Sequence, residues 1–105
     1  MSKEQVSALN DTELNRAMIW CYPVSGYCFM YAGHVYNGVS IELDRKLDYL
    51  SDYNLTMPLA VENNLGIEFM AVTRCEDYSS YKVSVNKNPL RAICEVLVMI
   101  KLEEQ

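Results

Sequence analysis

A run of apolar residues near the C-terminus constrains the fold more than any other feature of this chain. The segment 88–102 reads NPLRAICEVLVMIKL, and after Pro89 only Arg91, Glu95 and Lys101 interrupt its apolar residues. Asn88 is a favourable N-cap, and Pro89 suits the first helical position, where its missing N–H is not needed. A helix that is apolar on nearly every side is buried on nearly every side, and this one is too short and too charged to cross a bilayer. We therefore expect a central helix, covered by a sheet on one face and by other helices or a partner on the rest.

The rest of the composition is that of one small globular domain with an acidic middle. The chain has 105 residues, of which half are hydrophobic, and its net charge is −5. We expect a single domain over 1–105, with the polar residues 1–8 loosely held. Residues 41–80 contain eight acidic and three basic residues. This acidity argues against a phosphate-backbone binder, and it favours either contact with a basic protein surface or mimicry of nucleic-acid charge. The alternative is that the charge only keeps the protein soluble.

No motif in the sequence indicates a catalytic or metal-binding chemistry. Cys21, Cys28, Cys75 and Cys94 form no C-x-x-C pair, and His34 is the only histidine. Nucleotide-binding glycine loops and nucleophile motifs are absent. Asp44, Asp48 and Asp52 recur every four residues, but such a row is more typical of a solvated helix face than of a metal site. We expect a non-enzymatic protein without cofactor or metal. The polar N-terminus contains no signal-peptide pattern, so reduced thiols in a cytoplasm are expected.

Local patterns predict alternating helices and strands. Asn10 and Glu13 form a capping-box pattern that predicts a helix over 11–20, and turn signals at 25–26 and 37–38 predict a hairpin over 24–40. Residues 40–49 are ambiguous between a short strand and an irregular linker. A middle helix over about 52–64, capped by Ser51 or Asn54, is expected to be distorted near Pro58.

The C-terminal half completes the expected fold. Alternation predicts a strand over 67–73, a turn over 76–80, and a strand over 81–85 with Lys82 and Ser84 facing outward. The expected fold class is therefore α+β: a small antiparallel sheet of three to four strands with helices packed on it, in the order α-β-β-α-β-β-α, and with the C-terminal helix central.

Tyrosines near acidic and hydroxyl-rich turns are the main candidates for a binding surface, because tyrosine combines rigid contact area with a polar tip. The alternative is that these residues form the edge of the core with their hydroxyls in water. A small nucleotide-type ligand would use the cationic part of this set, Arg74, Tyr78, Tyr81 and Lys82. The full candidate set is Tyr49, Asp52, Tyr53, Arg74, Glu76, Asp77, Tyr78, Tyr81 and Lys82.

Two segments resemble a family of phage proteins. Residues 49–67 read YLSDYNLTMPLAVENNLGI, and residues 88–104 read NPLRAICEVLVMIKLEE. Together they resemble small phage-encoded proteins of the NinX-like type, which contain the domain called a phage ABA sandwich. The resemblance covers about two thirds of the chain and leaves out residues 22–45. The matching positions, which by their chemistry are caps and core, are Tyr49, Ser51, Asp52, Tyr53, Pro89, Ala92, Ile93 and Cys94.

The resemblance implies a context and no particular activity. It implies a phage or prophage accessory protein in the cytoplasm of a bacterial host. Small acidic proteins of that kind commonly bind and inhibit a host or anti-phage defence protein, and we expect that function here. The alternatives are that the protein sequesters a small signalling nucleotide, or that its role is structural or regulatory. A homo-oligomer that buries part of the final helix is also expected, whereas contact with nucleic acid or membrane is not.

Overall fold

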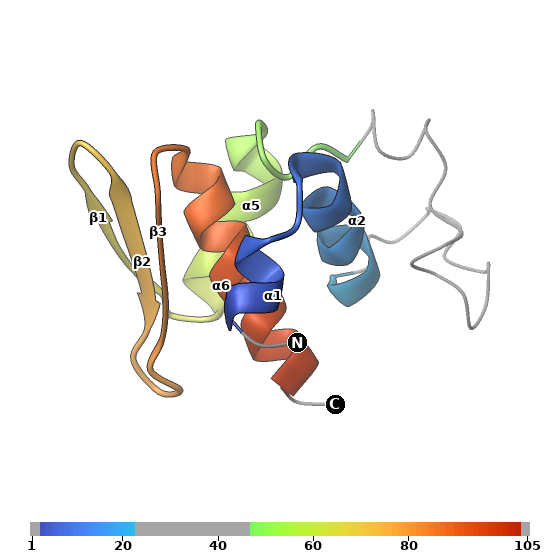
Figure 1. The fold of residues 1–105 in the computed structure, drawn as a ribbon. Coiled ribbons are helices and arrows are strands. Elements are labelled where there is room, and N and C mark those ends of the chain that lie inside the picture. The colour runs from blue at the N-terminus through green and yellow to red at the C-terminus, as the bar shows by residue number, and fades with distance from the viewer. Residues whose placement is uncertain (1–2, 23–46, 104–105) are drawn as a thin grey trace.

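The computed structural model describes residues 3–22 and 47–103, which form helices and one antiparallel sheet (Figure 1). The α+β class is confirmed, and the antiparallel sheet, expected to have three to four strands, has three in these residues, although the order of the elements differs from the expected one. The predicted hairpin over 24–40, with Cys28 and His34, lies outside the described residues. The elements in chain order are α1 (Lys3–Ser7), α2 (Asp11–Cys21), α5 (Tyr53–Glu62), β1 (Gly66–Phe69), β2 (Thr73–Asp77), β3 (Lys82–Asn86) and α6 (Pro89–Glu103).

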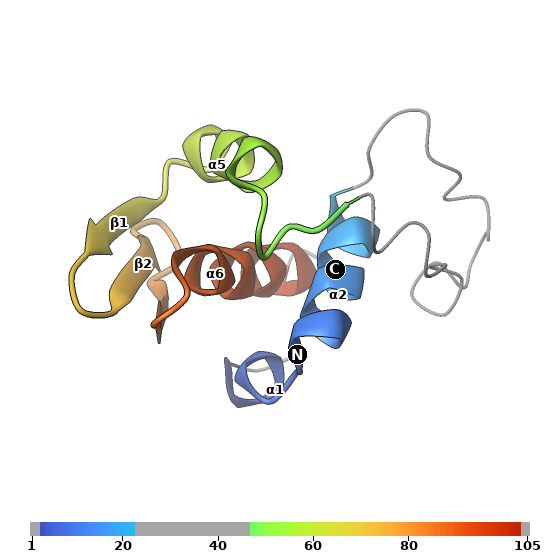
Figure 2. The same cartoon turned by 90° about the horizontal axis from the view of Figure 1, so that it is seen from above.

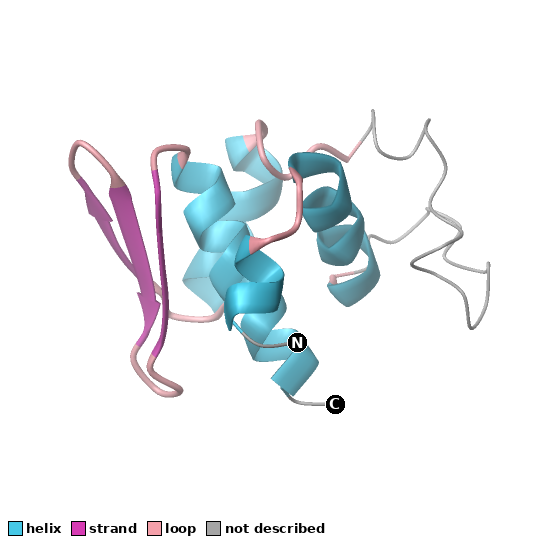
Figure 3. Cartoon of the chain, viewed as in Figure 1, coloured by secondary structure: helices cyan, strands magenta, loops and turns pink. Residues whose placement is uncertain are grey.

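Helix α6 lies at the centre of the described fold. It contacts β2 and β3 on one side and α1, α2 and α5 on the others. Seen from above, the sheet lies on one side of α6, α2 on the opposite side, and α5 and α1 on the two remaining sides (Figure 2). The strands are thus gathered on one side of the molecule and the helices on the other (Figure 3). The central position expected from the apolar run is confirmed.

The burial of α6 is achieved within one chain. Leu90 and every residue from Ala92 to Met99 are buried. Each fully buried Leu, Ile or Val contributes about 1.5–3 kcal/mol of transfer free energy, so this helix dominates the stability of the fold. A second copy is therefore not needed to cover α6, which was the reason for expecting a homo-oligomer.

The helix starts follow local capping chemistry. Both hydrogen bonds of the capping box between Asn10 and Glu13 are present, at 2.8 and 2.9 Å. The Asn88 side chain accepts from the backbone N–H of Leu90 at 3.0 Å, as its N-cap position in the sequence predicts. Helix α5 is capped by Asp52, whose carboxylate accepts from the N–H of Asn54. The predicted caps Ser51 and Asn54 were therefore wrong by one or two positions.

The strand predicted over 81–85 is confirmed as β3, one residue further along the chain, whereas the strand predicted over 67–73 was placed incorrectly. The predicted strand over 67–73 is two elements, because β1 ends at Phe69 and β2 starts at Thr73. The predicted turn over 76–80 overlaps the end of β2, and the turn itself occupies residues 78–81. From α5 onward the order is therefore α-β-β-β-α. Strand β2 reads TRCED, and its buried positions hold a threonine, a cysteine and an aspartate, so it lacks the apolar alternation that marks a strand.

The orientation of β3 and the state of the N-terminus also differ from expectation. Ser84 faces α6 and is buried, whereas Val85 is exposed, so the predicted outward direction of Ser84 was wrong. Ser84 lies opposite Cys75 in the sheet register, and this pair of small side chains leaves room for α6. The N-terminal segment expected to be loose contains α1, in which Val6 is fully buried.

Candidate functional site

In the described part of the chain, no helix packs on the face of the sheet that points away from α6 (Figure 1). Successive side chains of a strand point to opposite faces. In β2, Thr73, Cys75 and Asp77 are buried toward α6, so Arg74 and Glu76 lie on the other face. The antiparallel register then assigns their cross-strand neighbours to the same side. We call this the outer sheet face, and its residues are Gly66, Glu68, Arg74, Glu76, Val83 and Val85.

One end of the outer sheet face is covered by an aromatic ring. Tyr78 follows β2 directly and lies over Gly66, where a side-chain Cβ would collide with the hydroxyl end of the tyrosine ring. A glycine in β1 is unfavourable for a strand, and here it provides the space for this ring. Beside it, Nη1 of Arg74 lies 3.1 Å from Oε2 of Glu76. This ion pair is partly exposed and therefore contributes little to stability.

Exposed apolar side chains concentrate on this part of the molecule. Eight large hydrophobic residues are exposed in the described part of the chain, and six of them lie between residues 69 and 85. The other two, Tyr53 and Val61, are on α5. A concentration of this kind typically marks an interaction surface, because isolated exposed apolar residues are common but grouped ones are not. The six are Phe69, Met70, Val72, Tyr78, Tyr81 and Val85.

The turn between β2 and β3 holds Tyr81 in an unusual backbone conformation. Tyr81 has φ of 59°, in the left-handed region that bulky residues rarely adopt. Asp77 organises this turn: its carboxylate accepts from the N–H and hydroxyl of Ser79 at 3.3 and 3.0 Å, and from the hydroxyl of Ser80. Burial raises the pKa of Asp77, but these hydrogen bonds outweigh burial and hold the pKa below its ordinary value. Asp77 is therefore a structural residue of the turn.

The nine residues predicted for a binding surface fall into different parts of the structure. Arg74 and Glu76 share the outer sheet face with Tyr78, and Tyr81 lies in the adjoining turn. Lys82 lies opposite Asp77 in the register, on the face that points toward α6. The four residues considered for a small anionic ligand therefore do not converge. Arg74 on β2 and Lys82 on β3 lie on opposite faces of the sheet.

The remaining predicted residues belong to α5 and the core. Asp52 is the N-cap of α5, and Tyr53 starts that helix with a half-exposed side chain. Tyr49 is a core residue with 1% of its surface exposed, so it takes no part in a surface site. Its hydroxyl donates to the carbonyl of Tyr22 at 3.3 Å, and its own carbonyl accepts from Thr56 Oγ1 at 2.6 Å. Burial, with a smaller effect of Cys94, raises the pKa of Tyr49 to about 12.

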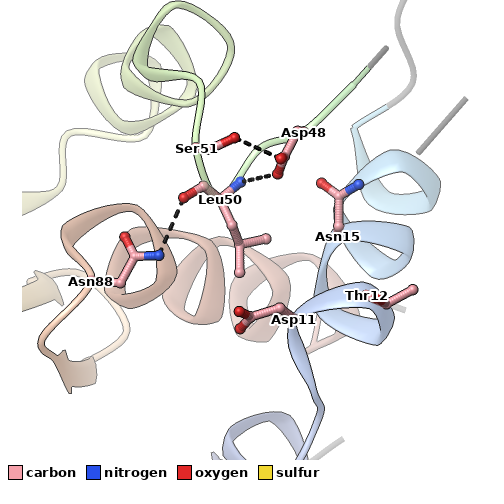
Figure 4. A pocket seen from close by; sticks show the side chains of 7 residues that line it. All are labelled: Asp11, Thr12, Asn15, Asp48, Leu50, Ser51 and Asn88. Carbon is pink, nitrogen blue, oxygen red and sulfur yellow. Dashed lines mark hydrogen bonds between the residues drawn. The ribbon is translucent and has the colours of Figure 1, made fainter. Parts of the chain in front are cut away.

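A polar pocket of about 350 Å³ lies where α2, residues 48–51 and the start of α6 meet (Figure 4). The Asn15 amide donates to the carbonyl of Leu47 and accepts from the N–H of Tyr49, both at 2.8 Å. The Asn88 amide donates to the carbonyl of Leu50, and the Asp48 carboxylate accepts from Leu50 and Ser51 (Figure 4). These hydrogen bonds fix residues 47–51 against α2 and the start of α6, so the residues that line the pocket have a structural role. We call this contact the joint between α2 and residues 47–49.

Reactive nucleophiles are not found among the described thiols. Cys21, Cys75 and Cys94 are all buried, and none of them forms a disulfide bond with another. Burial raises the pKa of Cys21 to about 11 and that of Cys75 to about 12, and it raises the pKa of Cys94 as well. A thiol must lose its proton to act as a nucleophile, so these groups are inert at neutral pH.

Within residues 3–22 and 47–103, no three His, Cys, Asp or Glu side chains are grouped as a metal site would require. In the same ranges no helix has the length and apolar character needed to span a membrane.

Comparison with known proteins finds no match to this chain among family models, curated proteins or solved structures. Among the described residues, the outer sheet face with its two turns, 70–72 and 78–81, is the surface that best fits a binding function.

Proposed function

We propose that this chain is a phage or prophage accessory protein that binds a host or anti-phage defence protein in the bacterial cytoplasm and blocks it without catalysis. The observation that carries this proposal is the exposure of large apolar side chains at the sheet: Val85 lies on the outer sheet face, Phe69 ends β1, and the other four lie in the turns 70–72 and 78–81. The phage context comes from the resemblance of residues 49–67 and 88–104 to the NinX-like proteins.

The composition of this surface fits a protein interface. Tyrosine, phenylalanine and methionine are enriched in interface cores, and four of the six exposed residues here are of these types: Phe69, Met70, Tyr78 and Tyr81. Burying one such side chain fully in a partner contributes about 1.5–3 kcal/mol, so these side chains would provide a large favourable term against the cost of association. Around them, Glu68, Arg74 and Glu76 offer charged groups for a polar rim.

A protein partner fits this surface better than a small nucleotide does. A phosphate-bearing ligand needs cations and aromatic rings that converge on one point. Arg74 instead lies 3.1 Å from the carboxylate of Glu76, and Lys82 is directed to the opposite face of the sheet. The apolar groups extend from the 70–72 turn to the 78–81 turn at the other end of the sheet (Figure 1), which is a long surface for a small molecule to cover.

The proposal is tested by co-purification. The full chain, carrying an affinity tag, is expressed in a bacterial host and purified, and native mass spectrometry determines what elutes with it. We expect a host protein at fixed stoichiometry. Val85→Arg places a charge on the outer sheet face and should release that protein, while Val61→Arg, the same change at an exposed position on α5, should retain it. A protein that elutes alone, or with only a small molecule of a few hundred daltons, contradicts the proposal.

A further inference from the structure

A second pocket, of about 350 Å³, lies on the helical side of the molecule, between the end of α2, the first two turns of α5 and the last turn of α6. Seen from above, α2 and α5 lie on two different sides of α6, with α2 opposite the sheet (Figure 2). The pocket shares no lining residue with the polar pocket at the start of α6, and none with the outer sheet face. A ligand bound here would therefore occupy a different part of the molecule from the proposed protein partner.

Helix α5 provides an apolar wall for this pocket. Leu55 and Leu59 are four residues apart, so they lie on one side of the helix, and the ring of Pro58 lies beside them. Both leucines pack against the core and remain partly exposed at the pocket. Apolar surface of this kind favours a ligand that has a hydrocarbon part.

Two tyrosine side chains complete the apolar part of the lining. The hydroxyl of Tyr22 donates to the carbonyl of Leu97 on α6 at 2.7 Å, and the hydroxyl of Tyr49 donates to the carbonyl of Tyr22 at 3.3 Å. Both rings are therefore held in place by the fold itself. A preformed cavity of a few hundred Å³, lined by apolar and aromatic side chains with few polar groups, is typical of a small-molecule site.

The charge at this pocket is positive. Among the described residues that line it, Lys101 is the only charged one, and its Nζ lies 5.5 Å from the centre of the Tyr22 ring. The same charge acts on the thiol of Cys21: burial raises the pKa of Cys21 to about 11, and Lys101 opposes that rise. An ammonium group with three N–H donors beside an apolar cavity favours an anionic group on the ligand.

Two acidic residues lie close to this lining in sequence, just before α5, and neither of them lines the pocket. The carboxylate of Asp48 lies in the polar pocket, where it accepts from the N–H of Leu50 and the hydroxyl of Ser51 (Figure 4). The carboxylate of Asp52 caps α5 by accepting from the N–H of Asn54. Both carboxylates are engaged in local hydrogen bonds of their own.

We propose that this pocket binds a small, free amphiphile with an apolar chain and an anionic head, the chemistry that a medium-chain fatty acid represents. The chain lies against α5 and the two tyrosine rings, and the head accepts a hydrogen bond from Nζ of Lys101. A cavity of about 350 Å³ holds one short chain and not the two long chains of a membrane phospholipid. The site lies apart from the outer sheet face, so it does not depend on the proposed function.

Decanoate, kept below its micellar concentration, is the probe for this site. Calorimetry measures its affinity for the full chain, and the NMR shifts of the backbone amides locate it. We expect decanoate to bind at one site and added salt to weaken it, while decylamine, its cationic counterpart, does not bind. Hexanoate should bind more weakly, because a shorter chain buries less apolar surface. The amide shifts should change at residues 21–22, 54–59 and 101.

Lys101→Met removes the charge and keeps an apolar side chain of similar length. It should weaken decanoate binding at least about tenfold, or about 1.4 kcal/mol, since a hydrogen bond to a charged group is lost. Lys87→Met removes the same charge at an exposed position before α6 and should leave the affinity unchanged. Lys101→Glu should reverse the preference, so that decylamine binds better than decanoate.

Leu59→Ser tests the apolar wall, and it should also weaken decanoate binding. Val61→Ser is the matched control, because Val61 is on the same helix, is 71% exposed and does not line the pocket. Leu59 also contacts the core, so thermal melting verifies that its variant folds. The charge reversal at Lys101 tests the site independently of that variant.

Several outcomes would overturn this proposal. The site does not exist if decanoate gives neither heat nor shift changes. Equal losses from Lys101→Met and Lys87→Met would show a general effect of charge. Shift changes confined to residues 66–86 would place the amphiphile on the sheet. Sedimentation with phosphatidylglycerol vesicles that Lys101→Met abolishes would assign the pocket to a lipid surface and not to a free amphiphile.

Discussion

Arg91 and Asp11 are 80 positions apart in the chain, yet Nη1 of Arg91 lies 2.7 Å from Oδ1 of Asp11. The same guanidinium donates to the carbonyls of Leu9 and Ser7 at 2.6 and 3.3 Å, and its Nε lies 3.4 Å from Oε2 of Glu95. One side chain on α6 therefore holds α1 and the start of α2 in place. It also provides a counter-charge for Glu95, which is only 3% exposed.

We expect Arg91→Met to destabilise the protein by about 3–5 kcal/mol, because it leaves the Glu95 carboxylate buried without its partner. Urea unfolding measures the loss. The double variant Arg91→Met/Glu95→Leu replaces the pair with apolar groups and should recover most of the stability. Asp11→Asn should have little effect, since Asp11 is largely exposed. A double variant no more stable than Arg91→Met would contradict this role of Glu95.

The features of the sequence that predicted the fold correctly are those whose signal is local. The apolar run of α6, the capping box at Asn10 and the cap at Asn88 each depend on a few neighbouring residues, and all three are present. Strand β2 could not be found in this way, because its buried positions hold small or polar residues. These positions are buried because α6 packs against β2, and only the folded chain brings the two together.

Asn15 should be essential for the joint between α2 and residues 47–49. Its amide satisfies both the carbonyl of Leu47 and the N–H of Tyr49, and the residue is buried. Asn15→Ala leaves two backbone groups without partners, and we expect a loss of about 1–3 kcal/mol in unfolding free energy. Native-state hydrogen exchange should show faster exchange at the Tyr49 amide. Thr12→Ala, at an exposed position beside the same pocket, is the control and should change neither quantity.

Asp77 should make the stability of the protein depend on pH in the acidic range. Its pKa is held below the ordinary value of 3.8, so its contribution is fully present above that pH and is lost as the pH falls through the folded pKa. Unfolding free energies measured from pH 6 to 3 should therefore fall less steeply in Asp77→Asn than in the wild-type chain. Carboxyl NMR titration in the double variant Ser79→Ala/Ser80→Ala should show a raised Asp77 pKa. An unchanged pKa there would contradict the role of the serines.

The buried thiols should resist modification. Cys28 lies outside the described residues, so the measurement uses a Cys28→Ser variant. With the pKa of Cys21 at about 11 and those of Cys75 and Cys94 higher, reaction with an aromatic disulfide at pH 8 should be at least about a hundredfold slower than for free cysteine. Three thiols should react after unfolding in urea. A rapidly reacting thiol in the folded variant would contradict the burial of one of these residues.

The candidate surface was only partly predictable for a physical reason. Tyr78 and Tyr81 stood out because they occur among turn residues, and both are exposed. Phe69, Met70 and Val85 were assigned to strands, where apolar residues normally face the core. Apolar residues are also found at the surface, and composition does not reveal which ones are. The exposure of Phe69 and Met70 follows from where β1 ends, and that of Val85 from Ser84 facing α6.

Hydrogen–deuterium exchange on the complex with a co-purified host protein tests the outer sheet face as the binding surface most directly. Exchange is compared between the free chain and the complex. We expect slower exchange in the complex over residues 66–86, which include both turns, and no change over α2. Slower exchange confined to α2, or no change over residues 66–86, would contradict the central claim that this protein acts by binding another protein through its sheet.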